Sequence, residues 1–362
     1  MKHPYPEHQP ARLSLSLKQK EEHLMNSFSY IRAADPAEAV SQLAQQSNGK
    51  FVAGGTNLFD LMKENIEQPP YVIDINRLDL ARIEPLPQGG LRLGALVTNA
   101  DTAWNELVEQ NYPLLSKAIL AGASPQLRNM ATNGGNPLQR TRCYYFYDHA
   151  TPCNKREPGT GCSALNGFNR IHAILGTSEH CIATHPSDMC VALRALGARV
   201  NIKGVNGERT IDFADLHRLP GDAPHLDNNL EHGDLITSID LPEKQFKTNV
   251  AYLKLRDRQS YAFALVSVAV ALEMNGDQIL EARVALGGVA HKPWRDEAAE
   301  EQLKGQPATA DHFKAFADTV LSGAIGYGHN TFKIELAKRA IVRALTTAAA
   351  QSVEEPSSQP LV

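Results

Sequence analysis

The sequence has little of what marks disulfide-rich, nucleic-acid-binding or membrane proteins. It contains five cysteines in 362 residues, and so small and odd a number argues against a complete disulfide framework. The formal net charge is −4, from 36 basic and 40 acidic residues, so the positive surface that binds nucleic acid or an anionic membrane is missing. The longest apolar run, residues 261–272, is far shorter than the roughly 20 residues that span a bilayer. We therefore expect no nucleic-acid partner and no membrane insertion.

What is present is ordinary globular composition, with 43% hydrophobic and 21% charged residues, which is enough for two or three domains. Residues 1–24 mix Pro, His, Gln and charge without the apolar segment of a secretory signal. We expect them to be a disordered leader, with the folded chain starting at Met25. The polar residues 350–362 are expected to form a flexible tail.

Between these ends, short strand-like segments alternate with helix-like ones, which predicts a mixed α/β or α+β protein. The first domain is expected over residues 25–216, with subdomains of about 25–75 and 76–216. A stretch rich in Pro, Asp, Asn and His, residues 217–234, predicts a linker. Residues 235–349 place strands first and helices last, which is typical of a separate α+β domain.

Two glycine-rich turns are the first chemical signal. Glycine permits positive φ and close backbone approach, and amides at the start of a helix form a ready anion site. A diphosphate needs donors from two sides, so two such turns favour a nucleotide more than one does. Neither turn fits GxGxxG or GxxxxGK[ST], which disfavours a Rossmann site and a P-loop, and simple tight turns remain the alternative. The candidate residues are Val52, Ala53, Gly54, Gly55, Thr56 and Asn57 in the first turn, and Thr132, Gly134, Gly135 and Asn136 in the second.

Four of the five cysteines lie in residues 137–185, a stretch without helical or strand periodicity. The intervals between Cys143, Cys153, Cys162 and Cys181 are 9, 8 and 18 residues. None of them forms a CxxC pair, so this spacing is poor evidence for a zinc ribbon. Four thiolates in one irregular loop suit a tetrahedral metal or a [4Fe-4S] cluster. The alternative is a solvated basic loop with unligated cysteines. Cys190, on the apolar face of a predicted helix, is expected to be a buried structural thiol.

Taken together, these segments resemble the FAD-binding (medium) subunit of the xanthine oxidase, or molybdenum hydroxylase, family over about residues 25–349. VAGGTN resembles the first flavin pyrophosphate loop of the family and ATNGGN the second. Asp188 in HPSDM matches a flavin contact, and Lys254 in YLKLRD matches a lysine that reaches the flavin ring. The resemblance implies a two-subdomain FAD-binding domain of the PCMH type, similar to vanillyl-alcohol oxidase, followed by a C-terminal α+β domain with an antiparallel sheet and helices.

In most of the family the second glycine loop leads almost directly to the Asp segment, but here residues 137–185 separate them. Such an insert is similar to two branches that carry a [4Fe-4S] cluster there: the bacterial periplasmic aldehyde oxidoreductases and the 4-hydroxybenzoyl-CoA reductases. QRTRCYYFYD, PCNKREPGTGC and VALGGVAHKPWR are more similar to the first branch. The resemblance implies that Cys143, Cys153, Cys162 and Cys181 ligate the cluster.

The resemblance also implies the partners. This chain is expected to be the electron-transfer subunit of a heterotrimer, without catalytic residues of its own. A large subunit with a molybdenum cofactor would oxidise aldehydes to carboxylic acids, a small [2Fe-2S] subunit would pass the electrons to this chain, and an unidentified external acceptor would receive them. A reductase of the 4-hydroxybenzoyl-CoA type and a non-catalytic zinc-binding module are the alternatives. A periplasmic location, reached through a partner's export signal, is expected, with the cytoplasm as the alternative.

Overall fold

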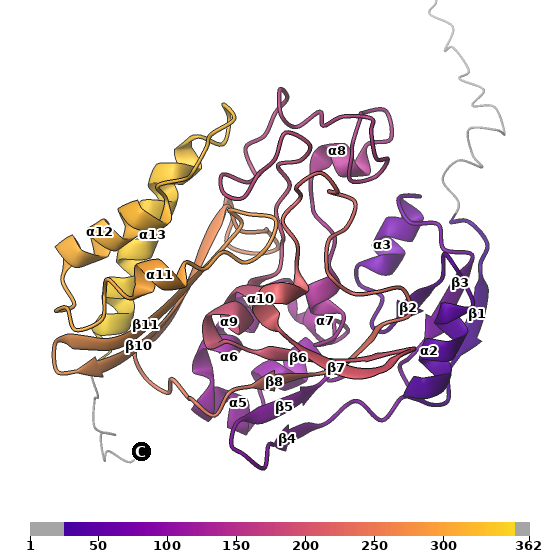
Figure 1. Cartoon of the computed structure of the whole chain (residues 1–362), viewed down its shortest axis with the longest axis horizontal. Coiled ribbons are helices and arrows are strands. Elements are labelled where there is room, and N and C mark those ends of the chain that lie inside the picture. The colour runs from indigo at the N-terminus through magenta and orange to yellow at the C-terminus, as the bar shows by residue number, and fades with distance from the viewer. Residues whose placement is uncertain (1–24, 352–362) are drawn as a thin grey trace, which may run out of the picture.

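The computed structural model describes residues 25–351 and contains three sheets (Figure 1). The predicted leader, residues 1–24, and nearly all of the predicted tail lie outside the described residues. Helices accompany each sheet, so the predicted mixed α/β class is confirmed. The insert of residues 137–185 forms the loops at the top of Figure 1, and its regular elements are the 3-10 helix η1 (Asn136–Leu138) and α8 (Tyr144–Tyr147).

The first subdomain is a three-stranded parallel sheet of order β1-β3-β2. Its first helix begins at Pro36, because the Asp35 side chain accepts hydrogen bonds from two backbone amides of the first turn and proline suits the first helical position. The chain leaves β2 through the first glycine turn and enters α3 directly. The elements are β1 (Ser29–Arg32), α2 (Pro36–Ala44), β2 (Lys50–Val52), α3 (Leu58–Lys63) and β3 (Tyr71–Asp74).

The second subdomain is a five-stranded sheet of order β4-β5-β8-β6-β7. Its core is shared with α6 and α9, whose buried side chains pack on β5, β6 and β8. The strands are β4 (Ile83–Pro85), β5 (Leu91–Gly94), β6 (Arg199–Gly204), β7 (Gly207–Asp212) and β8 (Leu235–Leu241). The helices are α4 (Asn99–Ala103), α5 (Glu106–Asn111), α6 (Pro113–Ala121), α7 (Pro125–Arg128), α9 (Asp188–Leu196) and α10 (Phe213–Leu216).

The expected domain boundary at residue 235 is wrong. Strand β8 is the central strand of the second subdomain, where it pairs antiparallel with both β5 and β6. Residues 217–234 are therefore a connection within this sheet, and the chain crosses to the C-terminal domain only after Leu241. The polar composition of this segment suggested a solvated linker, but His217 is buried and Asp227 forms ion pairs with Lys155 and Arg140 of the insert.

The C-terminal domain is an antiparallel sheet of order β11-β10-β9 with helices on it. One face of β10 packs with α12 and α13, and the small side chains of Ala269 and Ala271 on the other face join the core that contains α9. Burial on both faces explains the long apolar run in the sequence, which only Ser267 interrupts. The elements are β9 (Val250–Leu255), β10 (Val266–Asn275), β11 (Gln278–Gly287), α11 (Glu297–Glu300), α12 (Ala310–Val320) and α13 (Phe332–Ala349).

Candidate flavin and cysteine sites

The two glycine turns lie against each other. A Cβ atom at Gly54 would stand 1.7 Å from the carbonyl oxygen of Met130, which directly precedes the second turn. No side chain fits in that space, so close packing of the two turns requires glycine at this position. The structure therefore brings together two segments that the sequence separates by more than seventy residues.

The first turn keeps donors available for a ligand. Among the described residues, the backbone amides of Gly54, Gly55 and Thr56 donate to no protein acceptor. The Asn57 side chain accepts a 2.9 Å hydrogen bond from the Arg140 amide, while its buried Nδ2 has no partner in the described part of the chain. Buried donors without partners are uncommon in folded proteins. This donor set fits the pyrophosphate of a dinucleotide such as FAD.

The second turn, in contrast, uses its amides to hold itself in place. The Gly134 amide donates to the Ala95 carbonyl at 2.8 Å, and the Gly135 amide donates to Oγ1 of Thr132 at 3.2 Å. What remains for a ligand here is the hydroxyl proton and the backbone amide of Thr132, which donate to no acceptor among the described residues. Asn136 extends the contact to α9, because its Oδ1 accepts a 2.5 Å hydrogen bond from the Ser187 hydroxyl.

Asp188 and Lys254, both expected near the flavin, form a buried ion pair of 2.8 Å with side chains 7% and 5% exposed. Lys254 also donates to the Ala121 carbonyl at 3.0 Å, so it is not a solvated edge charge. Tyr252 was not predicted as a site residue. Its hydroxyl donates to Asp188 at 2.6 Å, and burial raises its pKa well above the usual value. Its position two residues before Lys254, on the same face of β9, was a usable signal. Flavin contact by these residues stays a prediction.

Two histidines contact the backbone directly after the second turn. The Nε2 atoms of His185 and His217 lie 3.2 and 2.7 Å from the Pro137 carbonyl oxygen, and burial lowers their pKa values to about 4 and about 3. Both imidazoles are therefore neutral, and each carries one proton to donate. Cys190 completes this group, with ligand-type atoms of all three residues within 4.8 Å of one another. Cys190 is fully buried, as expected, and burial raises its pKa to about 12.

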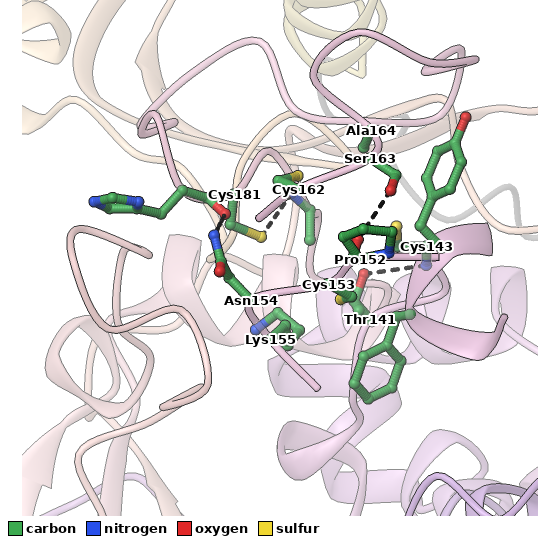
Figure 2. Close-up of a pocket in the computed structure, with 14 residues that line it drawn as sticks. Thr141, Cys143, Pro152, Cys153, Asn154, Lys155, Cys162, Ser163, Ala164 and Cys181 are labelled. Carbon is green, nitrogen blue, oxygen red and sulfur yellow. Dashed lines mark hydrogen bonds between the residues drawn. The ribbon is translucent and has the colours of Figure 1, made fainter. Parts of the chain in front are cut away.

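The four cysteines of the insert line a single cavity (Figure 2). Cys143 directly precedes α8. Cys153 and Cys162 pair with each other in a short antiparallel bridge, and Cys181 pairs with Ser178 in a second one. All five cysteines of the chain are free thiols. The irregular loop thus gathers the four sulfur atoms that the sequence spreads over residues 143–181.

The surroundings of the cavity suit an anionic metal cluster. Burial raises the pKa of Cys143 to about 12 and that of Cys181 to about 11, so these thiols ionise only when a metal binds them. The Ala183 amide lies 3.4 Å from Sγ of Cys181, and the ammonium group of the buried Lys155 stabilises the thiolate of Cys181. Four soft ligands with N–H donors and a nearby cation are the donor set of a [4Fe-4S] cluster.

The insert packs directly on α3, the helix that follows the first glycine turn. Leu61 of α3, the helix after the first glycine turn, shares a small core with Cys143, Phe146 and Cys153. Arg142 adds a 2.7 Å ion pair to Asp60 of the same helix. The two candidate sites are therefore neighbours through α3.

Sequence comparison decides the family. Residues 26–244 match the model of the FAD-binding domain in molybdopterin dehydrogenase, and residues 251–348 match that of the CO dehydrogenase flavoprotein C-terminal domain. The chain belongs to the FAD-binding subunits of the molybdopterin dehydrogenases. The two matched regions meet between β8 and β9, as in the structure, and the resemblance noted in the sequence is confirmed.

Similar members of this FAD-binding family come from several bacteria. The chain is 51% identical over 329 residues to the aldehyde oxidoreductase FAD-binding subunit PaoB of Escherichia coli (strain K12), covering 91% of this chain and 100% of that protein. It is 27% identical to the carbon monoxide dehydrogenase medium chain of Hydrogenophaga pseudoflava, covering 89% and 96% of the two. The solved carbon monoxide dehydrogenase of that organism, in the form lacking the Mo-pyranopterin moiety, superposes with a TM-score of 0.72 at 26% identity, covering 91% of this chain and all of that one.

Proposed function

We propose that this chain is the FAD- and [4Fe-4S]-carrying electron-transfer subunit of a heterotrimeric molybdenum-dependent aldehyde oxidoreductase. It accepts electrons from a small [2Fe-2S] subunit and delivers them to an external acceptor, while a large molybdenum-cofactor subunit oxidises the aldehyde. The relative of 51% identity supports the aldehyde reaction. The observation that supports a [4Fe-4S] cluster in this chain is the single cavity lined by Cys143, Cys153, Cys162 and Cys181.

The chain's own residues bind and orient the two groups. Bound FAD supplies the exchange between two-electron and one-electron steps. The free amides of Gly54, Gly55 and Thr56 would bind its pyrophosphate. The Asp188–Lys254 ion pair, at the start of α9, would present the flavin with a polar surface of no net charge. The insert keeps the cysteine cavity dry through Phe146 and other buried side chains that leave it little solvent contact.

The decisive experiment is the analysis of iron, acid-labile sulfide, zinc and FAD in the full complex purified without oxygen. About four iron, about four sulfide and about one FAD per copy of this chain, beyond the [2Fe-2S] contribution of the small subunit, are expected. FAD without the additional iron would reduce the insert to a docking loop. Zinc in place of that iron would support the zinc-binding alternative for the insert.

Substrate turnover separates the two enzymatic alternatives, because both would carry the same cofactors. The complex is expected to reduce an artificial acceptor with aromatic and aliphatic aldehydes. Turnover only with an aroyl-CoA thioester and a strong reductant would instead identify the reductase type.

The periplasmic location stays a prediction. No helix among residues 25–351 is long and apolar enough to cross a membrane. Cell fractionation of the tagged chain, with and without its partner subunits, tests the location: export that depends on a partner subunit is the expected result.

A further inference from the structure

His172 of the insert contacts one of the four cysteines that line the cavity. His172 is 1% exposed, and its Nε2 lies 3.0 Å from Sγ of Cys143. Its other ring nitrogen, Nδ1, is buried and has no partner among the described residues. The ring therefore has one polar contact, and that contact is a cysteine sulfur.

The direction of this hydrogen bond follows from the state of the sulfur. A cysteine that ligates a metal is a thiolate, which has no proton to donate. The atom 3.0 Å away must then carry the proton, so the neutral imidazole of His172 has its hydrogen on Nε2. Nδ1 is left as an acceptor without a donor, at a cost that the Nε2–H···Sγ bond to a charged sulfur offsets.

The C-terminal domain fixes the position of this ring. The His172 carbonyl accepts a 2.8 Å hydrogen bond from the ammonium group of Lys333, which is fully buried in the first turn of α13. Asn330 donates to the Ala173 carbonyl at 2.9 Å. The rings of Tyr144 and Tyr145 flank the imidazole, each with a centroid distance of 6.2 Å. The histidine is thus held through its backbone by the C-terminal domain and on its ring faces by two tyrosines.

We propose that His172 is a positioning and tuning residue of the cluster: its Nε2–H donates to Sγ of Cys143 and raises the reduction potential of the [4Fe-4S] group. The inference rests on the proposed function, since it needs the cluster. The physical cause is that an added electron increases the negative charge on the ligand sulfurs, and an N–H···S hydrogen bond stabilises that charge more in the reduced state than in the oxidised one.

The test is a potentiometric titration of the purified complex, followed by electron paramagnetic resonance of the reduced cluster. His172→Phe keeps a flat ring and removes the donor, and it is expected to shift the reduction equilibrium about tenfold toward the oxidised form, which for one electron is about 59 mV. His172→Gln keeps an N–H near the Nε2 position and is expected to restore most of the wild-type potential. His149→Phe, an exposed histidine of the same insert whose ring contacts the Glu64 carbonyl, is the matched control.

The outcomes separate the two proposals. A wild-type complex without the additional four iron atoms contradicts the proposed function. A wild-type complex with the cluster, together with a His172→Phe variant of unchanged potential, overturns the tuning role alone. If His172→Phe assembles no cluster, the wild-type complex labelled with 15N-histidine decides: a histidine nitrogen coupled to the reduced cluster, lost in His172→Gln, supports the hydrogen bond, and the absence of coupling overturns it.

Discussion

The flavin site and the cysteine insert are built in opposite ways. The flavin-side residues come from β2, the segment after α7, α9 and β9, which are far apart in the sequence and belong to both domains. The cluster residues come from one continuous stretch that contains a single short helix, α8. Regular elements pair their backbone groups with one another, whereas an irregular loop pairs them partly in local turns and partly with side chains.

The insert shows that dependence on side chains in detail. Nη1 of Arg156 donates to the carbonyls of Tyr145 and Phe146, and Oδ1 of Asn154 accepts from the amides of Gly159 and Gly161. The comparison teaches that the flavin site depends on backbone shape and close packing, and that the insert depends on individual polar and charged side chains.

Substitution of Asp227 is expected to destabilise the insert more than any other change described below. This carboxylate, although burial opposes its ionisation, has its pKa held below the usual range by Lys155 and Arg140, and it lies 2.5 Å from Lys155. Asp227→Ala leaves the buried Lys155 without an anion and Arg140 with Glu67 alone, and is expected to cost about 3–5 kcal/mol of unfolding free energy. The measurement is the denaturant midpoint together with iron per chain.

Iron is expected to fall in the Asp227→Ala variant while FAD binding largely remains. Asp79→Ala serves as the control, since its pair with Arg82 is solvent-exposed and worth at most about 1 kcal/mol. Equal losses of iron and FAD would contradict the separation of the two regions.

On the flavin side, the Asp188–Lys254 pair is the next largest expected effect. Lys254→Met leaves a buried carboxylate with only Tyr252 as its donor and is expected to cost about 3 kcal/mol, the lower end for a broken buried pair. In a double-mutant cycle with Asp188→Asn, the coupling energy is expected to be about 1–3 kcal/mol. Additive losses of stability and of FAD affinity would show that the two side chains do not act as a unit.

Close packing of the glycine turns is tested by Gly54→Ala. The added methyl group would overlap the Met130 carbonyl oxygen and is expected to cost about 1–3 kcal/mol and most of the bound FAD. The measurements are FAD per chain and iron per chain. Gly323→Ala, where a Cβ meets nothing within 4 Å, is the control. Retention of FAD in Gly54→Ala would refute the close approach of the two turns.

The smallest expected effect is on the pH dependence of the free energy of unfolding, and it comes from buried histidines alone. Burial lowers the pKa of His185 and His291 to about 4 and that of His217 to about 3, so the unfolded chain binds more protons than the folded one between about pH 6.5 and 4. Stability therefore falls as the pH falls through this window. His217→Phe removes one of these protons and is expected to reduce the slope by about 1.4 kcal/mol per pH unit. An unchanged slope would mean that His217 is already charged in the folded protein.

Much of the architecture could be predicted from the sequence because it depends on neighbours in the chain. The Asp35-Pro36 helix start, the two glycine turns and the run that became β10 all carry their signal within about ten residues. The placement of β8 could not be predicted in this way, since its alternation of apolar residues fits either domain. Only its pairing with β5 and β6 decides which sheet it completes.

For the sites, the sequence by itself determined which residue types are present: two glycine turns and four thiols in one irregular stretch. The tertiary structure decided their partners. It pairs Asp188 with Lys254 and Tyr252, places Asp227 between two cations of the insert, and brings His172 to Cys143. Hydrogen bonds and ion pairs act over a few ångströms in space, whatever the separation along the chain, so only the folded chain reveals which charges and donors meet.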